Sequence, residues 1–146
     1  KPKVHIGKNE FIAKTDFTKK VYPKFTNGIE LNSVCLAVFR RKILGGISFP
    51  ENFRTAEDMA FSLEAYTRAE NVVFAAKEIY CYYQSGSGLT GSGISVRQKY
   101  KYNFFISARI IKYLKCWGMN SFKWKICAAL RPVRLTFDKL KRRNNR

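Results

Sequence analysis

Hydrophobic residues recur every three or four positions through most of the second half of the chain, which is the spacing of an amphipathic helix. Residues 95–117 predict one such helix, and Gly118 is expected to end it. Lys101, Lys112 and Lys115 cluster on the polar face. The predicted apolar face contains Tyr102, Phe105, Ile106, Ile110, Tyr113, Leu114 and Trp117.

A second apolar series follows Gly118 and continues to the polar tail. Pro132 is expected to kink or divide this segment, because proline removes a helical hydrogen bond. The apolar positions of the series are Phe122, Ile126, Ala129, Leu130, Val133, Phe137 and Leu140. The two segments together predict a helical hairpin whose apolar side packs onto the core.

Two further helices are predicted in the first half of the chain. Residues 31–44 carry apolar residues at helical spacing, end in a basic cluster and stop at two glycines. The next helix is expected to begin at the Glu57-Asp58 pair, with Thr55 as its N-cap. Its predicted buried face contains Phe61, Leu63, Ala65, Tyr66 and Ala69.

Strands and loops are predicted between these helices. Residues 72–74 and 79–83 are β-branched and aromatic runs, which predict two short strands. Residues 1–28 have no helical period and predict a loop with one strand at most, and residues 86–93 predict a glycine-rich loop.

The length of the chain indicates a single hydrophobic core, and its composition gives a strong positive charge. The 146 residues are enough for one globular unit, and 28 basic against 10 acidic residues give a net charge of +18. Residues 97–146 hold 15 of these bases and a single acid, Asp138. The bias indicates an anionic partner, which charge alone does not identify as nucleic acid, phospholipid or phosphorylated substrate.

The cysteines and the single histidine argue against a zinc site. The chain has no Cys-x-x-Cys pair, and the expected state of the thiols is free and buried. The four cysteines are Cys35, Cys81, Cys116 and Cys127.

The adjacent carboxylates of Glu57 and Asp58 are the most informative candidates for chemistry. They stand after a loop at the predicted start of a helix, where the helix dipole favours negative charge. A rigidly held carboxylate there suits removal of a proton from an alcohol. Acids are also common in a first helical turn for structural reasons, and Thr55 and Asp58 have the spacing of a capping box. Spacing alone therefore favours the structural explanation.

Three blocks between residues 32 and 90 change that ranking, because their order resembles the second half of bacterial family 2 glycosyltransferases of the GT-A fold. The first block, residues 32–44, contains Phe39 followed by basic residues and an aliphatic pair. The second runs from Ile47-Ser48-Phe49-Pro50 to Glu57-Asp58, and the third spans residues 72–84. Together the blocks are more specific than any one of them.

The resemblance implies an α/β fold and a catalytic role for the acidic pair. Residues 1–94 would form the acceptor-side part of a GT-A domain, and residues 95–146 would form basic amphipathic helices. Asp58 would be the general base of inverting transfer, deprotonating the acceptor hydroxyl that attacks the anomeric carbon of a nucleotide sugar. Glu57 would orient the acceptor or tune that base.

Substrate and cofactor expectations follow from the same resemblance. Arg54 is a candidate contact for phosphate or acceptor, and Ser87 lies in a loop that would act as a lid. The family's nucleotide-binding half, with its Asp-x-Asp type metal motif, has no counterpart here, so Mg²⁺ or Mn²⁺ is expected to bind outside this chain, which is expected to supply no metal ligand. The processive Gln-x-x-Arg-Trp pattern is also absent, which favours transfer of a single sugar to a glycan or lipid-linked acceptor in polysaccharide biosynthesis.

The basic helices also predict contact with a membrane surface. No apolar run approaches the roughly 20 residues that span a bilayer, so the expected location is cytoplasmic and peripheral on the inner face of the cell membrane. Aromatic residues beside lysines form the predicted interfacial patch on anionic lipid. The patch contains Lys101, Lys112, Lys115, Trp117, Lys123 and Trp124.

Two other functions compete with the transferase hypothesis. A basic nucleic-acid-binding protein would account for the charge and for aromatic residues interleaved with lysines around residues 99–105, but it leaves Glu57 and Asp58 unexplained, so nucleic acid is not the favoured partner. A membrane-docking fragment without catalytic activity would depend on residues 95–146 alone.

Overall fold

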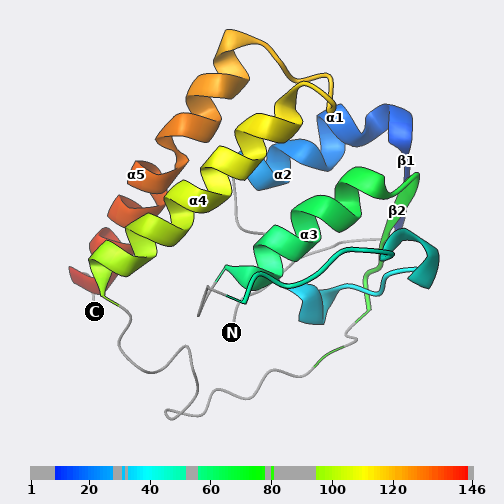
Figure 1. The fold of residues 1–146 in the computed structure, drawn as a ribbon, viewed down its shortest axis with the longest axis horizontal. Coiled ribbons are helices and arrows are strands. Elements are labelled where there is room, and N and C mark those ends of the chain that lie inside the picture. The colour runs from blue at the N-terminus through cyan, green and yellow to red at the C-terminus, as the bar shows by residue number, and fades with distance from the viewer. Residues whose placement is uncertain are drawn as a thin grey trace.

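The computed structural model describes residues 9–27, 31, 33–51, 56–77, 80 and 95–144, with side chains as far as residue 137. This part of the chain is a mostly helical domain with a two-stranded antiparallel sheet (Figure 1). The helices are α1 (Phe17–Lys20), α2 (Tyr22–Asn27), α3 (Glu57–Arg68), α4 (Val96–Leu114) and α5 (Phe122–Asn144). The strands are β1 (Glu10–Ala13) and β2 (Asn71–Phe74). Short 3-10 turns span Lys14–Asp16, Val34–Leu36 and Arg41–Ile43.

The sheet joins the start of the described chain to the segment that follows α3. Phe11 lies opposite Val73 in the register, and Ile12 lies opposite Val72. Because successive side chains of a strand point to opposite faces, Ile12 and Val72 pack on the core while Phe11 and Val73 are exposed. β2 confirms the strand that was predicted at residues 72–74.

The helix predicted for residues 31–44 is wrong. The described residues of this segment form two 3-10 turns joined by an extended stretch at 37–40. Their apolar side chains do not share one packing surface, because Phe39 packs against core residues of α3 whereas Val38 is exposed. A helix in this segment would therefore not have had one apolar face to bury, although the residues have helical spacing.

β1 is the one strand allowed by the prediction for residues 1–28, but the loop predicted after it is wrong, because α1 and α2 form there. Phe17, Val21 and Phe25 recur every fourth residue and are fully buried. Pro23 stands in the first turn of α2, where a missing N–H costs no helical hydrogen bond. The apolar residues of this segment do have helical spacing, but over too few residues to predict a helix from the sequence.

α4 confirms the predicted helix, and both of its ends have a physical cause. The Ser95 hydroxyl accepts from the Gln98 N–H at 3.2 Å, and the Gln98 side chain accepts from the Ser95 N–H at 3.1 Å, which is a capping box. At the other end Gly118 adopts a φ of +69°, and the Met119 N–H donates to the Leu114 carbonyl at 2.9 Å. This Schellman-type ending requires the left-handed conformation that glycine adopts without strain.

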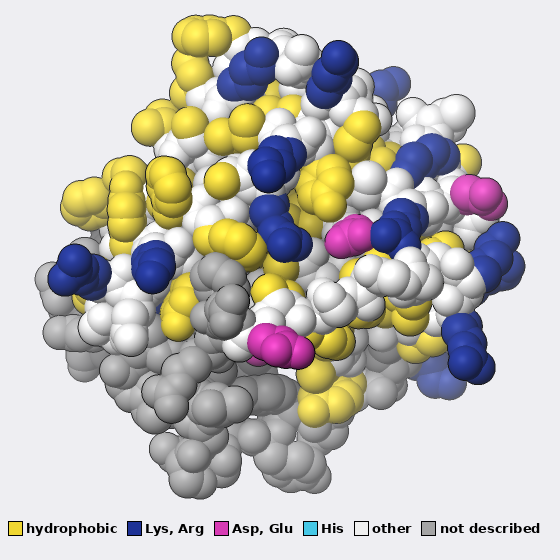
Figure 2. Space-filling model, viewed as in Figure 1, with side chains coloured by type: hydrophobic (Ala, Val, Ile, Leu, Met, Phe, Trp, Pro, Cys, Tyr) yellow, Lys and Arg dark blue, Asp and Glu magenta, His cyan; other side chains and the backbone are white. Residues whose placement is uncertain are grey.

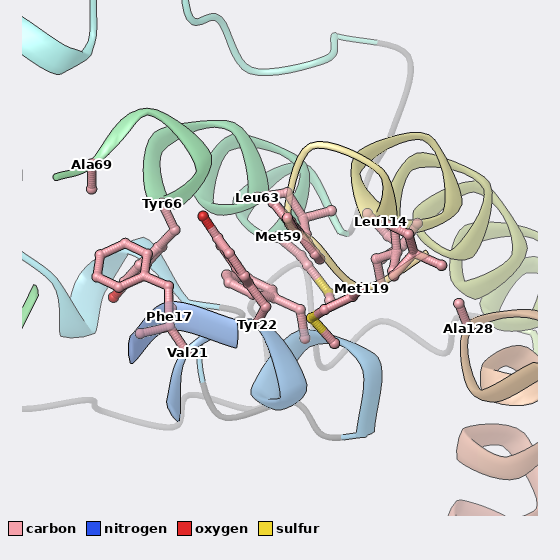
Figure 3. Close-up of a cluster of buried hydrophobic side chains, with 14 of the residues drawn as sticks. Phe17, Val21, Tyr22, Met59, Leu63, Tyr66, Ala69, Leu114, Met119 and Ala128 are labelled. Atoms are coloured by element: carbon pink, nitrogen blue, oxygen red, sulfur yellow. The ribbon is translucent and has the colours of Figure 1, made fainter. Parts of the chain in front are cut away.

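The core draws on both halves of the chain. Figure 3 shows Phe17 and Val21, Leu63 and Tyr66, and Leu114 converging on one cluster from separate elements. α3 contributes the buried face that was predicted for it, which confirms Phe61, Leu63, Ala65, Tyr66 and Ala69 as buried residues.

α5 packs on α4 with a different face from the predicted one. The helix is continuous through Pro132, so the proline does not divide it. Its buried side is formed by Ala128, Arg131 and Pro132. Six of the residues predicted to pack on the core are exposed instead: Phe122, Ile126, Ala129, Leu130, Val133 and Phe137.

Stability at high pH is expected to depend on Tyr22. Burial, and to a smaller extent the nearby Cys116, raises the pKa of Tyr22 from 10.0 to about 12. Since the folded state resists ionisation, its advantage is complete below pH 10.0 and is lost as the pH rises toward about 12. We expect the free energy of unfolding to fall across this window, and to fall less steeply in Tyr22→Phe. Denaturant titrations at a series of pH values measure this free energy. An equal fall with pH in the two proteins would contradict the assignment.

Candidate functional site

The predicted acidic pair occupies the first turn of α3. Glu57 is the first residue of the helix, and Ala56 precedes it as an N-cap with a φ of 76° and no side-chain hydrogen bond. That left-handed conformation is unusual for a residue with a Cβ. The chain thus enters α3 through a sharp bend that places both carboxylates at the positive end of the helix dipole.

The two carboxylates have different surroundings. One oxygen of Asp58, Oδ2, accepts a hydrogen bond from the Val34 N–H at 3.4 Å, which ties the side chain to the 3-10 turn at Val34–Leu36. Glu57 Oε2 is buried and has no hydrogen-bond partner among the described residues. Asp58 is therefore oriented by the backbone, while Glu57 Oε2 accepts no hydrogen bond from the described part of the chain.

Several predicted features lie outside the described residues. They include Arg54, Ser87, the glycine-rich loop and, except for Tyr80, the strand at 79–83. The prediction of Thr55 as the N-cap is wrong, because α3 begins one residue later and its N-cap is Ala56. Among the described residues, no three His, Cys, Asp or Glu side chains lie close enough together to share a metal ion. Of the predicted catalytic and substrate-binding residues, the structure brings together Glu57 and Asp58.

Cys35, Cys116 and Cys127 are free thiols. Their free state was predicted, but burial was not a correct expectation for Cys35 and Cys116, which are both exposed. Cys81 lies outside the described residues.

A groove of about 490 Å³ lies at the opposite end of α3 from the acidic pair. It is bounded by the extended segment after Ala37, by the last turn of α3 and by β2, and its lining includes Phe39, Tyr66 and Arg68. Arg68 donates to Glu64 and to the Gly45 carbonyl. Arg68 is ten residues from Asp58, about 15 Å at the helical rise of 1.5 Å per residue. The groove is therefore separate from the candidate base.

One member of the predicted membrane patch does not lie at the surface. Trp117 is only 2% exposed, so its assignment as a surface residue is wrong. Its ring stacks on Tyr22 at 4.4 Å, and its Nε1 donates to Thr67 Oγ1 at 2.9 Å. Trp124 is half-buried against the core, with the Lys123 ammonium 5.6 Å from its ring centre. The four predicted lysines are exposed: Lys101, Lys112, Lys115 and Lys123.

Two arginines of α5 have a structural role that the sequence did not reveal. Arg131 is 1% exposed, and its Nε donates to the Phe25 carbonyl at 3.2 Å. Arg134 Nη2 donates to the carbonyls of Thr26 and Asn27 at 2.9 and 3.0 Å. Because the last carbonyls of a helix have no partner within it, these cations complete the C-terminus of α2. Burial, with a smaller contribution from Arg134, lowers the pKa of Arg131 to about 10, well below the usual value of a guanidinium.

Arg131→Ala is expected to lower the free energy of unfolding by about 2–4 kcal/mol, because it leaves a cavity and an unpaired carbonyl. Arg131→Met refills most of the volume and removes a buried charge, so we expect a cost below about 1.5 kcal/mol. Urea denaturation of both variants measures the difference. Equal losses would show that the hydrogen bonds of the guanidinium, rather than its volume, hold α5 on α2.

Neither a family model nor a curated protein nor a solved structure matches this chain. Among the described residues, each helix is too short or too polar to cross a bilayer.

Proposed function

We propose that this chain is the acceptor-side part of an inverting family 2 glycosyltransferase of the GT-A fold, with Asp58 as its general base. The observation that carries the proposal is the position of Glu57 and Asp58 at the first turn of α3, with Asp58 held by the Val34 N–H. The order of the sequence blocks around this pair, which resembles the second half of that family, supports the same function.

In the proposed reaction, Asp58 accepts the proton of an acceptor hydroxyl while that oxygen attacks the anomeric carbon of a nucleotide sugar. The new carbon–oxygen bond forms as the bond to the nucleotide phosphate breaks, which inverts the anomeric configuration and releases the nucleotide. Oδ2 is engaged by the Val34 N–H, so Oδ1 is the oxygen assigned to the proton. A carboxylate within hydrogen-bond reach of the acceptor hydroxyl is the group that this step requires.

Glu57 is assigned to the acceptor. Its carboxylate stands beside Asp58 in the same helical turn, next to the position proposed for the acceptor. A contact with the acceptor there would orient the attacking hydroxyl toward Asp58, which is the positioning role that an adjacent carboxylate can provide.

The proposed partners are a nucleotide sugar, a glycan or lipid-linked acceptor, and an anionic membrane surface on the cytoplasmic side. Mg²⁺ or Mn²⁺ would bind the donor diphosphate through residues other than those described here. The exposed lysines of α4 and α5 supply the positive charge that attachment to an anionic surface needs. Attachment of this kind is expected to strengthen with the anionic lipid content of vesicles.

The deciding experiment incubates the complete polypeptide with a panel of nucleotide sugars and a divalent metal, and measures the release of free nucleotide. Release with one donor that requires Asp58 would support the proposal and identify that donor. A folded, complete protein that releases no nucleotide across the panel would contradict it and favour a binding role.

A further inference from the structure

α5 presents a continuous apolar stripe to solvent. Phe122, Leu130 and Phe137 are 78%, 58% and 66% exposed. Ile126 and Val133 lie between them in sequence, and each is 39% exposed. The stripe comprises these five residues and is about 22 Å long at the helical rise of 1.5 Å per residue.

The stripe lies on the outer side of α5. At about 100° per residue, its five members fall within about 80° of one another. Ala128, Arg131 and Pro132 mark the opposite side of the helix, and they are buried. Figure 2 shows hydrophobic side chains gathered along the margin of the molecule that α5 forms in this view, on its left. One side of α5 is thus packed against the rest of the molecule, while the apolar stripe on the other side is exposed.

Basic residues predominate along the two helices, and Asp138, directly after the stripe, is the one acid of residues 97–146. Residues 95–137 contain ten basic residues and no acidic one. Lys123 and Lys125 are exposed beside the first turn of the stripe, one on each flank. An apolar helix face bordered by lysines is the arrangement of a helix that lies in the plane of a membrane surface.

The occupant of the stripe follows from this chemistry. A second copy of the chain would bring two surfaces of the same positive sign together around the apolar contact, which opposes association. Nucleic acid would match the charge, but Ile126, Leu130 and Val133 at the centre of the stripe offer no aromatic platform for bases. Hydrocarbon flanked by phosphate matches both the stripe and its border.

We propose that α5 is the membrane-binding element of this protein and lies along an anionic bilayer surface, with Phe122, Ile126, Leu130, Val133 and Phe137 inserted among the acyl chains. Lys123 and Lys125 then reach the lipid phosphates while their methylene stems stay at the apolar boundary. This inference rests on the proposed attachment to an anionic membrane, but it is independent of the proposed chemistry at Asp58. The residues inserted into the membrane are then those of the stripe, and not Trp117, which is buried.

The test measures binding of the complete polypeptide to phosphatidylcholine vesicles with and without phosphatidylglycerol. Leu130→Gln with Phe137→Gln leaves every charge in place, and we expect it to weaken binding to the anionic vesicles by about tenfold or more. The matched control is Phe11→Gln with Val73→Gln, which alters two exposed apolar residues of the sheet and is expected to leave binding unchanged.

A second measurement reports insertion directly. Tryptophan introduced as Phe137→Trp is expected to be quenched by brominated lipid, and tryptophan introduced as Val73→Trp is expected not to be. Equal losses in the two double variants, or equal quenching at the two positions, would overturn the proposal. So would a vesicle-free dimer that Leu130→Gln with Phe137→Gln dissociates, because the stripe would then be a self-association surface.

The outcome is separable from that of the transferase proposal. Nucleotide release with a water-soluble acceptor is expected to persist in the α5 variants, while Asp58→Asn is expected to bind vesicles normally. Loss of vesicle binding with retained release identifies the stripe alone, and loss of release with retained binding identifies the acidic pair alone.

Discussion

Asp58→Asn is expected to reduce nucleotide-sugar-dependent transfer by about 10²–10⁴-fold in the complete polypeptide, the usual contribution of a general base. The substitution keeps the size of the side chain, and its amide oxygen can still accept from the Val34 N–H. It removes the capacity to take a proton from the acceptor. The loss should therefore appear in kcat, with little change in KM for the donor.

Two controls separate this result from a loss of structure. Glu70→Gln removes another carboxylate, exposed beside β2 and remote from the start of α3, and is expected to leave transfer unchanged. The free energy of unfolding of Asp58→Asn should stay within about 1 kcal/mol of the unchanged protein. Full activity in Asp58→Asn would remove this residue from the mechanism, and an equal loss in Glu70→Gln would point to electrostatics of the whole surface.

Trp117→Ala is expected to produce the largest loss of stability, about 3–5 kcal/mol, which is the range for removing a large buried aromatic side chain. The variant loses the stack on Tyr22 and the hydrogen bond to Thr67 Oγ1. The indole also touches Phe25 and Tyr113, so the cavity would open where α2, α3 and the end of α4 meet.

Trp124→Ala is the matched comparison, because the second tryptophan is half-buried at the edge of the same core. We expect its cost to be less than half that of Trp117→Ala in chemical denaturation. Similar costs would contradict the assignment of Trp117 as the central residue. A vesicle-binding defect in Trp117→Ala without any loss of stability would restore the original view of this residue as an interfacial one.

α4 and α3 were the elements best predicted from sequence, because their local and tertiary requirements agree. α4 has a capping residue at Ser95, a glycine that ends it and a long apolar face that the core buries. α3 has its acids in the first turn and a buried face at the predicted positions. In such segments, local preference and packing select the same conformation.

The elements that were predicted wrongly are those whose conformation depends on distant contacts. Residues 31–44 have the apolar spacing of a helix, but Phe39 turns toward the rings of Phe61 and Tyr66 and the chain stays irregular. α1 and α2 are too short to give a long periodic pattern, and their stability comes from burial of Phe17 and Phe25.

Part of the candidate site could be predicted from the sequence, and part of it depends on the tertiary structure. The sequence singled out Glu57 and Asp58 because two carboxylates at a predicted helix start have a recognisable electrostatic setting. Only the tertiary structure brings the Val34 N–H to Asp58, since the two residues are 24 positions apart in the chain. The difference in surroundings between the two acids is therefore a property of the fold.

The sequence by itself determined the amphipathic helices, the ends of α4, the charge of the basic half and the acidic pair, because these depend on residues within a few positions of one another. Tertiary structure decided which side of each helix is buried. α5 has apolar residues around much of its circumference, and Arg131 and Arg134 must reach the carbonyls at the end of α2. That requirement turns Ala128 and Pro132 inward and the stripe outward, a choice that periodicity alone cannot make because it is decided by partners more than 100 residues away.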